Sequence, residues 1–479
     1  MKRNLFSKVF MTMTATAVMG LASCSNDNDP AGGQEVPQGK ATEMSLIFDL
    51  SGAATRAMSD ANATAGEMKI TKLDVYIYNE NGILEKFHEL DWQNDLEEVP
   101  GEANVYTTKK GYTATTGKKT ILVGANLTTN MKTLLKGTSA NGLMAKGANA
   151  TIAELTEGNE GFVMFSTEAA EPTLKEVANK DDVANYPTEN QVAVTLQRLS
   201  AKVAVGMTKQ LDVASGTQQG AAGTIADLGF LVDNTNKMFY MRQLNDDFTG
   251  FKDANLTKKD YNVADFELVA DYSALKTTDY KGITPNTPYA ALGDWNVDFG
   301  SENVTTDKEM QGVTRVVVKG KFTPESGVEV TDDGQGNYTF ANTPGHIADD
   351  ETYYVLNLPE IGGYAFFKEA DAKDNAKMTA FLKQEGGFDD TGAAAALLTM
   401  EEYKNGLNYW WVTVKDDQGD MLRNHYYKVD ITSIWAPGRP DGAFDPDKDD
   451  KPIDKETNIT VKVTVEPWNM VAFDADLRP

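Results

Sequence analysis

Two segments near opposite ends of the chain alternate apolar and polar residues. Between residues 43 and 50, every second side chain is apolar: Met44, Leu46, Phe48 and Leu50. Near the other end the same spacing recurs, ahead of a Pro-Trp pair: Ile459, Val461, Val463, Val465 and then Trp468. A period of two is typical of a β-strand that buries one face. Both segments are therefore predicted to be half-buried strands.

The chain between them carries the same signature many times. Strands are predicted at 69–78, 120–125, 192–205, 313–319, 352–358, 408–414 and 425–431. In the first of these, Leu73, Val75 and Ile77 share one face, Tyr76 and Tyr78 occupy the other, and residues 79–82 follow as a turn. Only three short helices are predicted, at 131–135, 371–383 and 393–404. Many short strands with Gly and Asn turns indicate an all-β protein of two β-sandwich domains, with short helices in its loops and a boundary near residue 190.

The first 24 residues have the features of an export signal. Lys2 and Arg3 precede an apolar run of about 13 residues, which is too short to span a membrane. The run ends in Leu-Ala-Ser-Cys, which matches the lipobox of bacterial lipoproteins and predicts lipidation of Cys24. Because Cys24 is the only cysteine of the 479 residues, no disulfide can form within the chain.

The two alternating segments are each attached through flexible sequence. Residues 25–43 are polar and contain Gly and Pro, so they are predicted to be a tether. Small residues surround Arg56 directly after the first segment, and no other arginine lies between it and Arg3. Residues 436–456 are rich in proline and acidic residues and are predicted to be an extended linker before the last strand. A strand on so long a linker could pack outside its own domain.

The net charge and the scarcity of catalytic motifs argue against several functions. The chain has 45 basic and 71 acidic residues, a net charge of −26, which disfavours nucleic acid as a partner. His88, His346 and His425 are widely separated, and no hydrolase, nucleotide-binding or metalloprotease motif occurs. The run 445–450 could chelate Ca²⁺, but it lacks the glycine and the terminal glutamate of an EF-hand, so a solvated linker is the better interpretation. No enzyme activity, cofactor or metal site is predicted.

Three segments together resemble a known family. They are Val194–Val205, with Arg198 and Lys202, then Arg423–Ile434, and then Ile459–Trp468 running on to Leu477. With the lipobox and Arg56, their order and spacing are similar to those of the Bacteroidales fimbrillins, which build type V pili. The similarity is greatest to the major subunit of the short (minor) fimbria.

This resemblance implies a fold and a mode of assembly. Family members consist of two transthyretin-like β-sandwiches and reach the outer membrane as lipoproteins. An arginine-specific surface protease then removes an N-terminal strand, and the C-terminal strand of another subunit fills the groove. Here this implies lipid on Cys24, cleavage between Arg56 and Ala57, removal of the strand with Met44, Leu46, Phe48 and Leu50, and donation of the strand with Ile459, Val461, Val463, Val465 and Trp468.

The implied domain limits follow from those sites. They are a signal peptide (1–24), a propeptide (25–56), an N-terminal sandwich (57–190), a C-terminal sandwich (191–435) and a linker with the donor strand (436–479). The implied partners are other copies of the chain in a linear polymer, anchor and tip subunits, the protease and the precursor's lipid anchor. The mature form would lie in an extracellular fimbrium.

Two alternatives from other classes remain at this point. A surface glycan-binding lipoprotein would share the lipobox and the sandwiches, and the pair Trp410-Trp411 could then stack on sugar, although core packing is the better interpretation. A lipoprotein hydrolase with a carboxylate pair is the other, because 71 acidic residues would hide such a pair.

Overall fold

A computed structural model describes most of the chain. The described residues are 39–49, 64, 66–102, 105–144, 146–157, 161–207, 222–242, 263–283, 295–304, 312–414, 421–442 and 459–467. Cys24, Leu50, Arg56, Ala57 and Trp468 lie outside these residues, so the expectations attached to them stay predictions.

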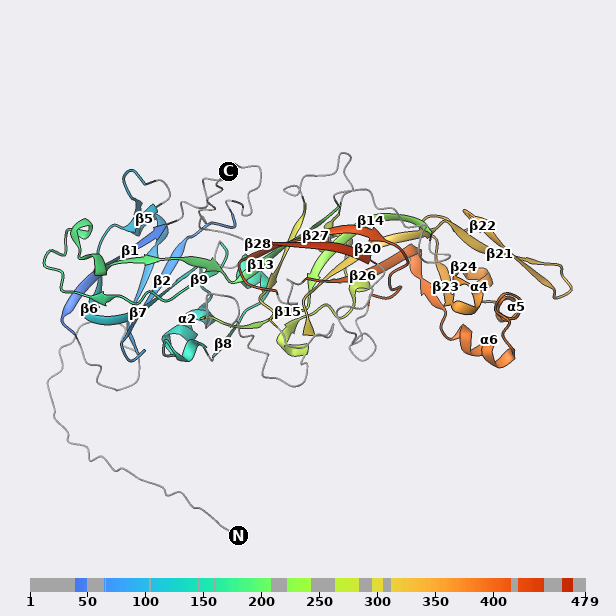
Figure 1. Ribbon diagram of the computed structural model, residues 1–479, viewed down its shortest axis with the longest axis horizontal. Helices are drawn as coiled ribbons and strands as arrows, with labels where there is room; N and C mark the ends of the chain where they lie inside the picture. The colour runs from blue at the N-terminus through green and yellow to red at the C-terminus, as the bar shows by residue number, and fades with distance from the viewer. Residues whose placement is uncertain are drawn as a thin grey trace, which may run out of the picture. The chain divides into compact units, whose positions relative to one another are not determined.

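Two sheets enclose the first hydrophobic core (Figure 1). One has the order β11-β1-β5-β4, with β6 also paired to β1. Its strands are β1 (Ala41–Asp49), β4 (Leu96–Glu98), β5 (Val105–Thr108), β6 (Tyr112–Thr115) and β11 (Gln191–Val194). The other has the order β12-β9-β7-β2-β3, with β10 paired to β7. Its strands are β2 (Lys72–Asn79), β3 (Leu84–Asp91), β7 (Gly117–Ala125), β9 (Met164–Ser166), β10 (Thr173–Leu174) and β12 (Leu196–Arg198).

Strand β2 is buried on both faces, as its alternation predicts. Leu73, Val75 and Ile77 pack in the core between the two sheets. Tyr76 and Tyr78 pack in a second core on the outer face, to which helices also contribute. The helices of this half are α1 (Trp92–Asp95), α2 (Thr129–Lys136) and α3 (Ile152–Thr156). The predicted helix at 131–135 is confirmed as part of α2.

A second pair of sheets encloses a second core. The first of these has the order β19-β13-β27-β28, and the second has the order β18-β14-β20-β26. Their strands are β13 (Ser200–Gly206), β14 (Gly223–Asp233), β18 (Lys281–Gly282), β19 (Val297–Ser301), β20 (Arg315–Pro324), β26 (Leu407–Thr413), β27 (His425–Ile434) and β28 (Ile459–Pro467). Short pairs are formed by β15 (Thr235–Asn236) with β17 (Phe266–Glu267), and by β16 (Met238–Tyr240) with β8 (Gly147–Asn149).

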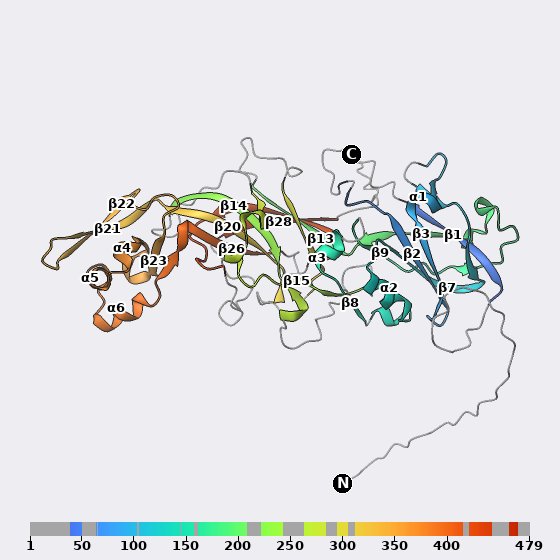
Figure 2. The ribbon, with the colours of Figure 1, turned by 180° about the vertical axis from the view of Figure 1, so that it is seen from behind.

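An inserted αβ unit separates β20 from β26, which are hydrogen-bonded neighbours. It has its own apolar core, and Figure 2 shows its helices gathered beside its strands. Its elements are β21 (Ser326–Asp332), β22 (Tyr338–Pro344), β23 (Tyr353–Leu358), β24 (Gly363–Lys368), α4 (Glu369–Ala372), α5 (Asn375–Gly386), α6 (Asp390–Leu397) and β25 (Glu401–Tyr403). The sequence predicts helices here but not a unit with a core of its own.

The all-β class is confirmed, and three details differ from expectation. The single helix predicted at 371–383 is two helices, because α4 ends at Ala372 and Asp374 caps the start of α5. The predicted helix 393–404 is wrong at its end, because α6 stops at Leu397 and Glu401–Tyr403 pairs with β23 instead. Residues 191–198, assigned from sequence to the C-terminal domain, form β11 and β12 and pair within the first two sheets. The change of sheet therefore falls after Arg198.

Candidate functional site

Strand β1, which contains the first alternating segment, lies in the interior of its sheet. Strand β11 runs parallel along one edge, with Ser45 opposite Gln191 and Phe48 opposite Val194. Strands β5 and β6 run antiparallel along the other edge, with β5 facing residues 47–49 and β6 facing residues 41–44. Because neighbours lie on both sides, removal of β1 would leave an open slot between them, which we call the β1 groove.

The floor of the β1 groove is apolar. Met44, Leu46 and Phe48 are buried and belong to the core between the first two sheets. The Phe48 ring also meets the Trp92 ring edge-on, with 5.9 Å between their centroids. The predicted burial of these three side chains is confirmed. A strand that replaced β1 would therefore need apolar side chains at every second position.

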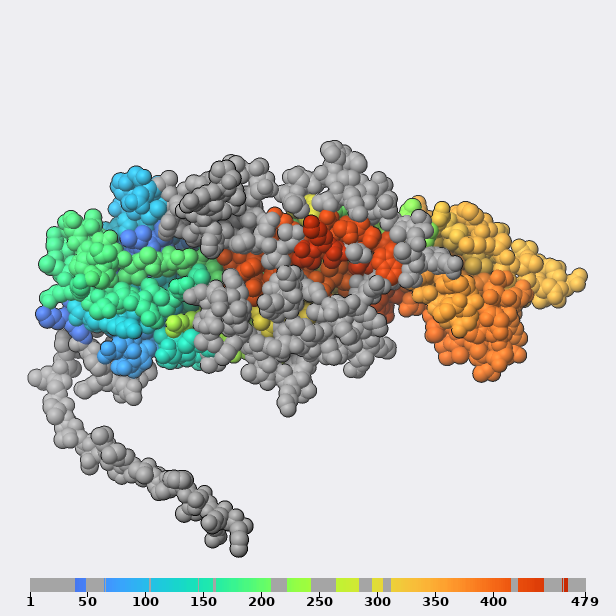
Figure 3. All heavy atoms as spheres, viewed as in Figure 1, coloured from blue at the N-terminus to red at the C-terminus, as the bar shows by residue number. Residues whose placement is uncertain are grey.

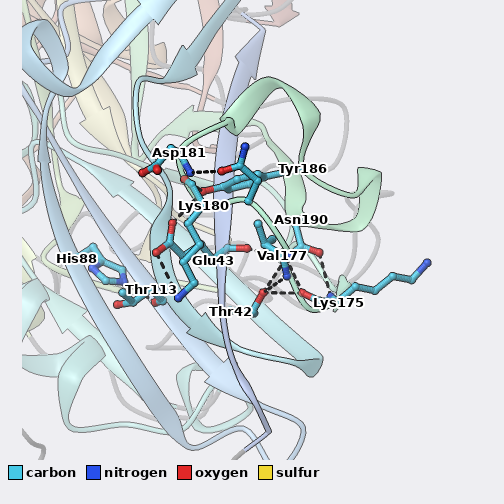
Figure 4. Close-up of polar contacts among 11 residues, drawn as sticks. Thr42, Glu43, His88, Thr113, Lys175, Val177, Lys180, Asp181, Tyr186 and Asn190 are labelled. Carbon is cyan, nitrogen blue, oxygen red and sulfur yellow. Dashed lines mark hydrogen bonds and ion pairs between the residues drawn. The ribbon is translucent and has the colours of Figure 1, made fainter.

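Polar contacts hold the start of β1 (Figure 4). The Thr42 hydroxyl donates to the Lys175 carbonyl (2.6 Å) and accepts from the Val177 amide (3.1 Å). The side-chain amide of Asn190 donates to the Glu43 carbonyl (2.6 Å) and to the Lys175 carbonyl (3.0 Å). Asn190 itself is 0% exposed, whereas its partners Glu43 and Lys175 are half-buried and exposed. We call the residues of segment 175–190 that bind Thr42 and Glu43 the clasp.

The side chain of Glu43 completes the clasp. The Tyr186 hydroxyl lies 2.8 Å from its carboxylate and 2.7 Å from the Lys180 carbonyl, and the Lys180 amine lies 3.7 Å from the same carboxylate. Burial, together with the hydrogen bond to Glu43, raises the pKa of Tyr186, so its hydroxyl remains a donor. Gly111 leaves the space for this contact, because a Cβ there would lie 2.1 Å from the Tyr186 hydroxyl.

Glu67, which lies downstream of the predicted cleavage bond, is held independently of β1. The Glu67 carboxylate forms a buried ion pair with Lys202 at 2.9 Å, and the Glu67 carbonyl accepts a hydrogen bond from Arg198 at 2.9 Å. These contacts attach the chain near residue 67 to β12 and β13. A cut at Arg56 would therefore separate β1 from a body that keeps its own attachment.

Strand β28, the second alternating segment, lies at the edge of its sheet and pairs antiparallel with β27 (Figure 1). Ile459, Val461 and Val463 are half-buried against the second core, whereas Lys462 is exposed. Part of β28 shows as dark red spheres on the surface seen in Figure 3. In the single chain this strand thus completes its own sheet, which the alternation and the linker do not predict.

The tryptophans and two of the histidines considered as binding or catalytic residues have contacts typical of structural residues. Trp410 and Trp411 are buried in two different cores, which confirms core packing. His88 and His425 bond to main-chain carbonyls of Thr113 and Arg423. In the described part of the chain, no group of three or more His, Cys, Asp and Glu side chains could hold a metal ion. Nor does any described helix have the length and apolarity needed to cross a membrane.

Comparisons with known proteins agree with this architecture. The family described as major fimbrial subunit protein (FimA) matches residues 42–222, and the family described as the C-terminal part of type IV fimbrillin matches residues 401–474. No curated protein sequence matches the chain.

Solved structures match over most of their length. A cell adhesion protein from Parabacteroides distasonis aligns with a TM-score of 0.50 and 13% identity, over 91% of this chain and 100% of that one. A cell adhesion protein from Bacteroides eggerthii aligns at 0.43 and 14%, over 91% and 98%. The tip fimbrial protein Mfa3 from Porphyromonas gingivalis aligns at 0.32 and 13%, over 89% and 100%. Of these, the first supports the fold.

The matched families define a structural, non-enzymatic subunit of a surface fimbrium, and the sandwiches agree with the fold of the first solved structure. The chain belongs to the fimbrillin family of fimbrial subunits.

Proposed function

We propose that this chain is a stalk subunit that polymerises by strand exchange. Cleavage after Arg56 frees β1, the β1 groove opens, and residues 459–468 of another copy fill it. Within a fimbrium this favours a stalk position, since an anchor has no need of a removable strand and a terminal cap has no need of a donor strand.

One observation carries the proposal: β1 is an interior strand whose only covalent link to the described body runs through residues 50–63. Cutting at Arg56 would leave β1 held by hydrogen bonds and packing alone, which a competing strand can replace.

The difference in burial between β1 and β28 favours transfer of the donor strand into the β1 groove. Strand β28 has one neighbour and half-buried apolar side chains, whereas β1 has neighbours on both edges and a fully buried face. Complete burial of a Val or Ile side chain stabilises by roughly 1.5–3 kcal/mol. Transfer of the donor from its own sheet edge to an empty β1 groove is therefore favourable, and main-chain hydrogen bonds on two edges add to it.

The export steps rest on Cys24, which we propose carries the lipid of an outer-membrane precursor. Several acyl chains would anchor the precursor stably, whereas one would bind weakly. The cleavage that removes β1 would also remove this anchor, so maturation and release from the membrane would be one event.

The glycan-binding alternative has lost its main support. The side chains proposed to stack on sugar, Trp410 and Trp411, are buried, and the Trp410 indole donates to the Ala436 carbonyl at 3.1 Å.

Mass spectrometry of cleaved protein tests the proposal. After treatment with an arginine-specific protease, fibres should contain chains that begin at Ala57 and should lack residues 41–49. Arg56→Ala protein should stay monomeric under the same treatment, and Arg439→Lys should assemble like the wild type. Fibres that retain residues 41–49 would refute strand exchange.

A further inference from the structure

Several polar groups of the clasp each lose a hydrogen-bond partner when β1 departs, although the Lys175 carbonyl keeps the Asn190 amide and the Tyr186 hydroxyl keeps the Lys180 carbonyl. The Lys175 carbonyl and the Val177 amide lose the Thr42 hydroxyl, the Asn190 amide loses one acceptor, and the Tyr186 hydroxyl loses the Glu43 carboxylate. Buried polar groups are costly when they have no partner. A replacing strand is therefore favoured if it brings a hydroxyl and an acceptor to these two positions.

We infer that the donor strand enters the β1 groove in the same direction as β1, with Thr457 in the place of Thr42. This inference rests on the proposed strand exchange and specifies its register. The two sequences correspond over seven positions: Thr42-Glu43-Met44-Ser45-Leu46-Ile47-Phe48 and Thr457-Asn458-Ile459-Thr460-Val461-Lys462-Val463.

The first two residues of the donor segment can replace the hydrogen bonds that Thr42 and Glu43 make with the clasp. Thr457 supplies the hydroxyl for the Lys175 carbonyl and the Val177 amide. The side-chain oxygen of Asn458 can accept from the Tyr186 hydroxyl, as the Glu43 carboxylate does in the precursor.

The remaining positions match the burial of β1. Ile459, Val461 and Val463 take the buried positions of Met44, Leu46 and Phe48. Thr460 takes the position of Ser45, which is 1% exposed and accommodates a small hydroxyl side chain. Lys462 takes the half-exposed position of Ile47, where its amine can reach water.

Other placements conflict with the groove. In the reversed direction Glu466 would replace Glu43, and Pro467 would then replace Thr42 without supplying a hydroxyl. In the same direction but two residues along, Ile459 would replace Thr42 and Lys462 would replace the buried Ser45. A buried amine without a partner is strongly disfavoured.

Cysteine cross-linking between subunits distinguishes the two directions. Thr113 on β6 is exposed and lies opposite Glu43. The residue that replaces Glu43 is Asn458 in the inferred register and Glu466 in the reversed one. The only native cysteine precedes Arg56, so the cleaved chain has no background thiol.

The experiment compares Thr113→Cys/Asn458→Cys with Thr113→Cys/Glu466→Cys in full-length protein that is cleaved, assembled and oxidised. Non-reducing gels should show a ladder of cross-linked multimers for the first pair and monomers for the second. A ladder from the second pair, or from neither pair in fibres seen by electron microscopy, would overturn the register. A different result would refute strand exchange itself, namely fibres that form from chains lacking residues 459–479.

Assembly kinetics give a second readout. Thr457→Val keeps the shape of the side chain and removes its hydroxyl, so assembly of cleaved protein should slow about tenfold, as expected for the loss of one buried hydrogen bond. Lys462→Ala, at the half-exposed position, should assemble at the wild-type rate. Equal rates for Thr457→Val and wild type would contradict the role of the clasp.

Discussion

At the scale of single residues, a few polar side chains decide how firmly β1 is held. Asn190 bridges the backbone of β1 and the segment before β11, and its side-chain oxygen also accepts from the Lys175 amide at 2.9 Å. These contacts lie far apart in sequence, and isolated Asn and Tyr residues carry no periodic signal. The sequence therefore predicts the apolar face of β1 but not the clasp that positions it.

Asn190→Ala is expected to destabilise the precursor by about 1–3 kcal/mol, since it removes the hydrogen bonds that this buried side chain makes with main-chain groups of Glu43 and Lys175. Asn185→Ala is the matched control, because Asn185 is exposed in the same segment and its side chain bonds only to Asp182. Its effect should stay within about 0.5 kcal/mol. Chemical denaturation of both variants measures the difference, and equal stabilities would contradict the clasp.

Cys24→Ala is expected to prevent surface fimbriae, because the lipid is the address that the sequence predicts for the precursor. Fractionation of cells that express this variant should find the chain without lipid and absent from the surface. Normal fimbriae on such cells would contradict the lipoprotein proposal.

At the scale of elements, β1 and β28 have different surroundings, and this separates the effects of mutations in them. Leu46→Ala should lower precursor stability by about 2–5 kcal/mol by leaving a cavity in the first core. It should leave the stability of finished fibres unchanged, because the proposed fibre no longer contains β1. Thermal melting of the precursor and dissociation of fibres measure the two effects separately.

Val463→Asp should leave the folding of the precursor intact but prevent fibre assembly, the reverse of what is expected for Leu46→Ala. Val463 is half-buried at a sheet edge in the single chain, so the precursor should fold. In the β1 groove its side chain would take the place of fully buried Phe48, where a carboxylate without a partner is strongly disfavoured. Cleaved Val463→Asp protein should therefore form no fibres in electron micrographs, whereas assembly at the wild-type level would contradict the burial of this face.

Element prediction succeeds where one pattern dominates and fails where distant contacts compete. The faces of β2 and the burial of Trp410-Trp411 follow from alternation within one strand. The Ala-rich run after residue 393 favours a longer helix, but Glu401–Tyr403 instead pairs with β23, which the local sequence cannot show. The pairing of β28 with β27 within one chain cannot be predicted from local sequence either, because β27 lies before the linker.

At the scale of the whole molecule, the two sandwiches have complementary tasks in the proposed assembly. The first contains the interior strand to be removed, and the second contains the edge strand to be donated. Buried contacts attach Glu67, downstream of Arg56, to Arg198 of β12 and Lys202 of β13, so the body should survive the cut. The acidic surface, with a net charge of −26, keeps such a subunit soluble until its groove opens.

The most direct test is a truncation that ends at residue 457, examined by thermal melting before cleavage and by electron microscopy after it. Because β28 covers only one edge of its sheet, the truncated precursor should still unfold in a cooperative transition. After treatment with the arginine-specific protease it should form no fibres, while the full-length chain does. Fibres from the truncated chain would contradict the proposal that residues 459–479 act as a donor strand between subunits.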